Sequence, residues 1–249
     1  MDQTPSLPPE VGEGIDQFLQ QTRQAFGGDL VSAVLFGSAA EGRLRSTSDV
    51  NLLLVLKRFD RSRADKIRDP LRAAHAAMRL DVMFLLEPEI GQAMDAFAVK
   101  FADILSRRRV LMGPDPFENL QISREAMLKQ TLQVLLNLML RMRERYALVS
   151  LREEQLALVI TDMIGPLRAC AASLLKLEAR PATSPKEALA IILSEQLGPT
   201  GADIVSLIDQ ARSQGSLPPG ASGTLLFSLL NAAEQMQQRA TGLLKGSRG

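Results

Sequence analysis

Two oxygen-bearing residues, Asp49 and Asn51, stand two positions apart at the start of the apolar run LLLVL. On a strand, alternate side chains project to the same face, so these two would lie about 7 Å apart on one side. An earlier apolar run, at 33–36, ends in Gly37-Ser38. Such a turn can place backbone N–H groups close to an anion. Oxygen ligands facing it would suit Mg²⁺ and a nucleoside triphosphate.

The spacing of these residues resembles a known signature. Gly37-Ser38, ten residues, then Asp49-x-Asn51 is similar to the glycine-serine and paired-aspartate pattern of the nucleotidyltransferase superfamily. That superfamily includes polymerase β, the minimal nucleotidyltransferases and the aminoglycoside adenylyltransferases. The family pattern has Asp where this chain has Asn51.

Two later segments extend the resemblance. Asp81 opens a predicted strand after an intervening helix, where the third carboxylate of the family is expected. The segment RVLMGPDPF resembles the strand and turn that end such domains. The resemblance covers about residues 31–117, and the helical remainder matches only in that such domains often carry a helical partner.

The resemblance implies a role for each matching residue. Gly37 and Ser38 would bind the β- and γ-phosphates of the nucleotide. Asp49, Asn51 and Asp81 would be the metal ligands, and Asp49 and Asp81 the catalytic carboxylates, with Asp81 as a ligand or as a base toward an acceptor hydroxyl. The implied reaction is attack on the α-phosphorus with loss of pyrophosphate.

An amide at position 51 changes the charge of this set. A carboxylate has two anionic oxygens and can bridge two Mg²⁺ ions, whereas the Asn51 amide offers one neutral oxygen. The set therefore carries two negative charges rather than three, which affects the acceptor-side metal most. Glu41, in the connecting loop, is a candidate to compensate.

Other polar residues have plainer explanations beside the functional ones. Arg43 and Arg45 are candidates for binding nucleotide phosphates, and a solvated loop explains them equally well. A hairpin with a solvent-facing edge is the plain explanation of the Asp49–Asn51 pair. His75 lies in a predicted helix and is better explained as a packed or surface residue than as a catalyst.

Composition excludes several other classes of site. The chain has one cysteine and one histidine, so a metal would need oxygen ligands, which favours Mg²⁺ or Mn²⁺ over zinc. A net charge of +1, no Trp and 4% aromatic residues predict no extended nucleic-acid surface. No His follows position 75, which excludes the Arg-to-His motif of the helical RNases that accompany minimal nucleotidyltransferases.

The N-terminal sequence and the hydropathy predict a cytoplasmic protein with no membrane partner. MDQTPSLPPE lacks the basic and apolar regions of a signal peptide. No run reaches the roughly 18 consecutive apolar residues of a membrane-spanning helix.

The periodicity of apolar residues predicts an α/β (α+β) domain with a small mixed sheet, followed by an all-α helical bundle. Predicted helices and strands alternate in the first half: helix 9–26, strands 31–36 and 49–56, helix 61–78, strand 79–86, helix 89–105 and strand 109–112. Pro70 is expected at a kink or at a second helix start.

A turn at 113–116, GPDP, marks the predicted domain boundary. The predicted parts are a disordered lead at 1–8, a nucleotidyltransferase-type domain at 9–116 and a helical bundle at 117–249. In the bundle, Ser123 should cap a long helix, and Gly165-Pro166 should kink the next. Shorter helices are expected at 185–196, 201–212 and 222–244.

Two functions remain open from the sequence. The first is transfer of a nucleoside monophosphate from an NTP, ATP above all, to a small-molecule or protein hydroxyl, with Mg²⁺ or Mn²⁺. The second is a catalytically weak or inactive module for binding or regulation, similar to the antitoxin-type minimal nucleotidyltransferases. The apolar stripes of the C-terminal helices would form a core or a homodimer surface.

Overall fold

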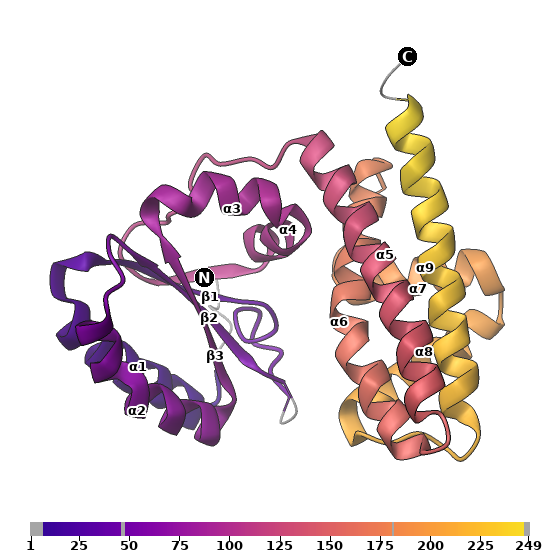
Figure 1. The fold of residues 1–249 in the computed structure, drawn as a ribbon, viewed down its shortest axis with the longest axis horizontal. Coiled ribbons are helices and arrows are strands. Elements are labelled where there is room, and N and C mark those ends of the chain that lie inside the picture. Colours follow the sequence, from indigo (N-terminus) through magenta and orange to yellow (C-terminus); the bar gives the residue numbers. More distant parts are fainter. Residues whose placement is uncertain (1–6, 46–47, 181, 247–249) are drawn as a thin grey trace, which may run out of the picture. The chain divides into compact units, whose positions relative to one another are not determined.

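The computed structural model describes residues 7–45, 48–180 and 182–246 (Figure 1). Most of the predicted disordered lead, residues 1–6, lies outside them. The chain divides into two compact units. The first comprises Met1–Met94 with Phe101–Gln121, and the second Asp95–Lys100 with Ile122–Gly249. The domain limits drawn from the sequence, 9–116 and 117–249, stay a prediction.

The first unit is built on a four-stranded mixed sheet in the order β3-β2-β1-β4 (Figure 1). The strands are β1 (Leu30–Phe36), β2 (Val50–Leu56), β3 (Leu80–Leu86) and β4 (Arg108–Met112). β1 pairs antiparallel with β2 and with β4, whereas β2 pairs parallel with β3. The two central strands are apolar and almost wholly buried, as expected when both faces of a sheet are covered.

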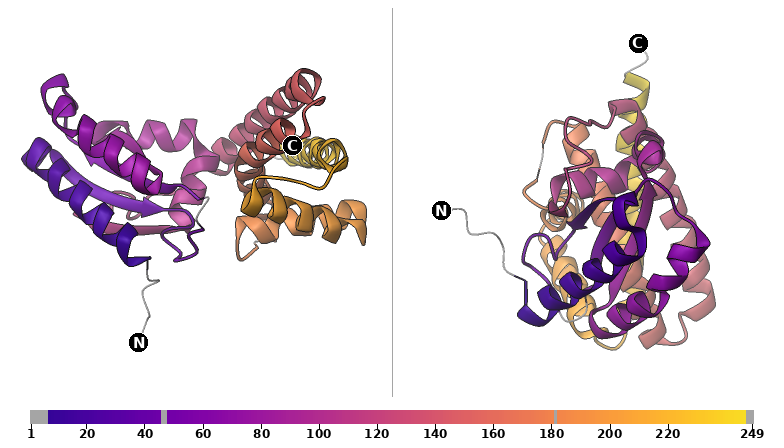
Figure 2. Two further views of the ribbon diagram at one scale, coloured as in Figure 1. Left: turned by 90° about the horizontal axis from the view of Figure 1, so that it is seen from below. Right: turned by 90° about the vertical axis from the view of Figure 1, so that its left-hand side faces the viewer.

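Helices α1 (Pro9–Phe26) and α2 (Arg61–Met78) lie side by side along one face of the sheet (Figure 2). Phe18 of α1 and Ile67 of α2 pack with Leu52 and Leu54 in the core of this unit. α2 runs through Pro70 as one helix, so the predicted second start is absent from this described segment. The proline lacks an N–H and removes one helical hydrogen bond.

The prediction of a single helix over 89–105 is wrong in one respect. The chain forms α3 (Ile90–Ala96) and α4 (Ala98–Ser106), separated by a turn at Phe97. The Phe97 side chain is 57% exposed, whereas Phe101 and Ile104 are buried. Because the helix is interrupted at Phe97, most apolar side chains of α4 are buried while the Phe97 side chain remains in solvent.

Within the described part of the chain, the second unit contains five long or medium helices: α5 (Arg124–Val149), α6 (Glu153–Leu177), α7 (Pro185–Leu197), α8 (Thr200–Gln214) and α9 (Ala221–Gly246). Ser123 caps α5 as predicted, because its hydroxyl accepts a hydrogen bond from the Ala126 N–H at 3.1 Å. α6 continues through Pro166, and its Cys170 side chain is wholly buried. The mixed sheet followed by a helical part confirms the predicted fold class.

One helix in the described part of the chain, α6, is long and apolar enough to cross a membrane by length and composition. Just over half of its most apolar window, 56%, is buried in the structure. Ile160, Leu167 and Leu174 are at most 1% exposed. The core helix of a bundle passes the same test, so the packing of α6 accounts for its composition.

Candidate active site

Asn51 and Asp81 lie next to each other across the sheet. The parallel register of β2 and β3 pairs Asn51 with Asp81, and neighbouring strands are about 4.8 Å apart. Asn51 is half-buried, whereas Asp81 is exposed. Val50, between the two oxygen-bearing positions, is wholly buried, as the alternation of side chains predicts.

The glycine-serine turn is on the other side of Asn51. Phe36, the last residue of β1, pairs with Asn51, and Gly37 follows it with φ at +76°. A β-carbon on Gly37 would lie 3.7 Å from the Asn51 Nδ2. The structure therefore brings together the turn, Asn51 and Asp81 at one end of the sheet, as the sequence predicts.

The backbone of the turn is compact, and one of its N–H groups is already used. The Gly37 N–H donates to the Arg107 carbonyl at 3.0 Å. The N–H groups of Ala40 and Glu41 donate back to the Gly37 carbonyl. The Ser38 and Ala39 N–H groups have no acceptor among the described residues. Ala39 is wholly buried, so the Ser38 N–H is the donor of this turn that remains for an anion.

Asp49 lies one residue before β2, and its carboxylate is held by a residue that the sequence analysis missed. Arg79 Nε donates to the Asp49 Oδ1 at 2.7 Å. The Asn51 Nδ2 also donates to the Asp49 main-chain carbonyl, at 3.3 Å. Arg79 stands two positions before Asp81, but nothing in its sequence context distinguishes it from other exposed arginines. Its role becomes visible only when the end of α2 is placed beside the start of β2.

Glu41 is held by an arginine in the same region. The Arg107 Nη1 donates to the Glu41 carboxylate at 3.3 Å, and Arg107 also bonds Asp103 at 2.9 and 2.5 Å. Burial alone lowers the pKa of the Arg107 guanidinium, but Asp103 and Glu41 outweigh burial and raise it. Glu41 is therefore engaged in this ion-pair cluster and is a poor replacement for the missing carboxylate at position 51.

The two loop arginines differ in their surroundings. Arg43 lies 4.0 Å from the Glu41 carboxylate and its side chain is 70% exposed. Arg45 is exposed, and its carbonyl accepts from the Ser48 N–H at 2.9 Å. His75 is placed apart from them, with Nδ1 3.0 Å from the Leu80 carbonyl, in contact with the start of β3.

The donor set fits one divalent cation better than two. Among the residues that the structure describes, no group of three or more His, Cys, Asp or Glu side chains gathers as a metal site. Asp49, Asn51 and Asp81 supply two carboxylates and one amide. Mg²⁺ is commonly held by one or two carboxylates together with substrate phosphates and water. By residue type these three would suit a single Mg²⁺ shared with a nucleotide, and in the structure the Asp49 carboxylate contacts Arg79.

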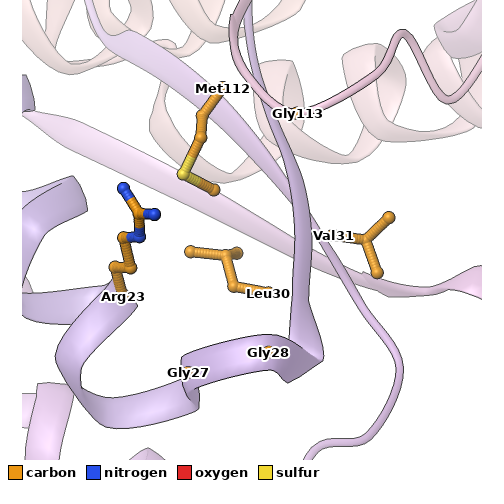
Figure 3. Close-up of a pocket in the computed structure, with 7 residues that line it drawn as sticks. All are labelled: Arg23, Gly27, Gly28, Leu30, Val31, Met112 and Gly113. Atoms are coloured by element: carbon orange, nitrogen blue, oxygen red, sulfur yellow. The ribbon is translucent and has the colours of Figure 1, made fainter.

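A cavity of about 510 Å³ lies elsewhere in the first unit (Figure 3). The side chains of Arg23, Leu30 and Met112 point toward one another around it. Leu30 begins β1, whereas Gly37 follows the end of that strand. At about 3.4 Å per residue, the cavity and the turn are roughly 20 Å apart along the strand. The cavity is therefore separate from the candidate active site.

Comparison with known proteins agrees with this geometry. Residues 15–107 match the family described as "Nucleotidyltransferase domain", a segment that contains the turn, Asn51 and Asp81. The match confirms the resemblance of this segment to the nucleotidyltransferase superfamily.

One curated relative is similar to a short segment of this chain, and one solved structure is similar to its fold. A "Putative protein adenylyltransferase" of Methanocaldococcus jannaschii is 46% identical over 52 residues, which are 21% of this chain and 35% of that protein. The aligned segment thus spans about a third of the relative's length. Spectinomycin adenyltransferase AAD(9) from Enterococcus faecialis, crystallised with ATP and spectinomycin, superposes with a TM-score of 0.64. It covers 92% of this chain and 99% of its own, at 11% identity, which shows a common fold.

Proposed function

We propose that this protein is an adenylyltransferase, which transfers AMP from ATP to a hydroxyl group of an acceptor and releases pyrophosphate. The observation that carries the proposal is the meeting of the Gly37 turn, Asn51 and Asp81 at one end of the sheet, inside a nucleotidyltransferase domain.

The turn would bind the triphosphate. Ser38 supplies an N–H group without a protein acceptor in the described segments, and it adds a hydroxyl. The φ of +76° at Gly37 allows the chain to reverse tightly here. Arg43, largely exposed in the same loop, would contribute positive charge toward the phosphates.

The carboxylates would act on the reacting groups. Asp49 and Asp81 would hold Mg²⁺, with Asn51 as a neutral oxygen ligand. A bound Mg²⁺ supplies charge neutralisation on the phosphates. The acceptor oxygen forms a bond to the α-phosphorus while the bond from that phosphorus to the bridging oxygen breaks. Pyrophosphate leaves, and Asp81 accepts the hydroxyl proton.

The adenine preference and the acceptor class rest on the names of the similar proteins. Both are described as adenylyl- or adenyltransferases, and the solved structure was obtained with ATP. One name specifies a protein and the other spectinomycin. We therefore propose ATP as the nucleotide and a small-molecule or protein hydroxyl as the acceptor. The comparisons do not favour the alternative of a non-catalytic, antitoxin-like module.

Thermal unfolding with ATP, GTP, CTP and UTP, each with and without Mg²⁺, tests the nucleotide site. A ligand at about 100 times its Kd adds roughly 2.7 kcal/mol of stability, which should raise the midpoint by about 5–10 °C. We expect this rise with ATP and Mg²⁺ in the wild type, and its loss in Ser38→Ala and Asp49→Ala. Asp65→Ala removes a carboxylate from α2 in the same unit and should keep the rise.

Transfer itself is measured as pyrophosphate release in the presence of candidate acceptors, with intact-protein mass as the readout for self-modification. A midpoint that no nucleotide raises would overturn the enzyme assignment. If the nucleotide still raised the unfolding midpoint of both Ser38→Ala and Asp49→Ala, the nucleotide site would lie elsewhere in the protein.

A further inference from the structure

Arg79 joins the end of α2 to the proposed active site by its main chain and its side chain. Its N–H donates to the His75 carbonyl at 2.8 Å, which closes the last turn of α2. Its carbonyl accepts from the Val50 N–H at 3.2 Å, and its guanidinium binds Asp49. Arg79 is therefore fixed beside the start of β2 before any ligand arrives.

The backbone conformation of Arg79 is unusual for this residue type. Its φ is +55°, in the left-handed region that glycine adopts most readily at a helix C-terminus. An arginine here is strained relative to a glycine. The Asp49 contact is the interaction in the described structure that a glycine at this position would lose.

The charge of the site differs from that of three carboxylates alone. Asp49 and Asp81 are acidic residues, Asn51 is neutral, and Arg79 carries a positive guanidinium. The four groups together carry a single net negative charge, where three carboxylates would carry three. In the free protein, one oxygen of the Asp49 carboxylate is also already paired with Arg79, so a divalent cation competes with the guanidinium for this ligand.

We propose that Arg79 is a resident cation that holds Asp49 in the nucleotide-free protein and must release it before a divalent metal binds. The inference rests on the proposed function for the metal and the nucleotide. Triphosphate oxygens entering at the turn attract the guanidinium, which frees Asp49 for the metal. Metal and nucleotide consequently bind together, and Arg79 acts as a positioning residue that sets this order.

The side-chain exposure of the pair is consistent with exchange of partners. Arg79 is 57% exposed and Asp49 53% exposed, so neither is locked in the core. Ion pairs of this exposure are weak in water and separate readily. A long, flexible arginine at this position can therefore change partner without rearrangement of the sheet.

Mn²⁺ binding to the nucleotide-free protein, measured from the free-ion signal in electron paramagnetic resonance, tests the proposal without reference to activity. We expect Arg79→Gln to bind Mn²⁺ more tightly than the wild type, by up to about fivefold, because a carboxylate is freed and a positive charge is removed. Arg79→Lys keeps the charge and should stay close to the wild type. Arg68→Gln breaks an Arg–Asp ion pair on the same helix and serves as the matched control.

Arg79→Gly distinguishes an effect of the guanidinium on metal binding from an effect of the substitution on folding. Glycine suits the positive φ, so this variant should fold at least as well as the wild type and show the same tighter Mn²⁺ binding as Arg79→Gln. Equal affinity in all variants, or no Mn²⁺ binding in any, overturns the proposal. Because these titrations contain no nucleotide, that failure is distinguishable from failure of the proposed function, which is an absence of ATP binding by the wild type.

Discussion

Asn51 lies between Phe36 and Asp81 in the sheet, paired with the first across antiparallel strands and with the second across parallel ones. Position 51 is therefore where the Gly37 turn and the exposed Asp81 carboxylate meet. A charge change at this position acts on both neighbours at once, which makes it the most informative position in the first unit.

Asn51→Asp should lower stability without metal and restore it with metal. The new carboxylate faces Asp81 on the adjacent strand, and like charges directly opposite each other destabilise a sheet by about 0.2–1 kcal/mol. Mg²⁺ between them should cancel this loss. Thermal unfolding in EDTA and in Mg²⁺ measures the effect, and Asn137→Asp, on the exposed side of α5, is the control. A variant equally stable in both conditions would contradict the placement of these side chains.

Gly37→Ala should destabilise the first unit by about 1–2 kcal/mol through the backbone. The φ of +76° is unfavourable for any residue with a β-carbon. The nearest side-chain atom would be 3.7 Å away, so steric overlap adds little. Chemical denaturation measures the change. In Gly28→Ala the added β-carbon has open space and no positive φ to oppose it, so the effect should be small.

Gly113→Ala should be far more damaging than Gly37→Ala. A β-carbon on Gly113 would lie 2.1 Å from the Val31 carbonyl oxygen, and φ is +75°. We expect a loss of about 3 kcal/mol or more, because backbone atoms of β1 must move. Gly91→Ala, in α3 with open space around it, should be neutral or stabilising by up to about 1 kcal/mol. Urea denaturation measures the stabilities. If Gly113→Ala were as stable as Gly91→Ala, this account of the end of β4 would be refuted.

Asp115→Asn should lower stability at neutral pH but have little effect in acid. Burial alone raises the pKa of the Asp115 carboxyl, but hydrogen bonds from Arg108 and from the Phe117 N–H lower it below its ordinary value. A lowered folded-state pKa gives stability that is complete above the ordinary Asp value of 3.8 and disappears as the pH falls through the folded value.

The difference between wild type and Asp115→Asn should therefore be about 1–2 kcal/mol at pH 7 and should close as the pH falls from about 5 to 2. Urea denaturation at several pH values measures it. Asp16→Asn, on the exposed face of α1, should show no such convergence. A difference that stays constant across the range would mean that the lost stability does not depend on ionisation of the Asp115 carboxyl, which would contradict this account.

Local signals in the sequence were sufficient to predict most elements of the fold. Ser123 identifies the start of α5 because a hydroxyl at that position satisfies a free N–H of the first turn. The apolar run after Asp49 identifies β2, and helical spacing identifies α2 with the observed limits. The turn at Phe97 was not predictable, because it depends on which residues of α4 meet the core.

In the candidate site, the sequence predicts the groups but not their partners. Alternation along β2 accounts for Asn51 and the buried Val50, whereas Asp49 lies just before the strand, and the family resemblance adds Asp81. The Arg79–Asp49 ion pair depends on the left-handed turn that ends α2, for which an arginine gives no signal. The use of the Gly37 N–H depends on the carbonyl of Arg107, which is distant in the sequence.

Cys170 has a practical consequence for measurement. It is the only cysteine of the chain and is wholly buried, and burial raises the pKa of its thiol to about 12. A thiol that is protonated and inaccessible does not react with maleimide dyes or nitroxide reagents while the protein is folded. The natural sequence therefore serves directly as a background for paired spectroscopic labels. One cysteine introduced on the surface of each unit would make the distance between the units, and its change during turnover, directly measurable.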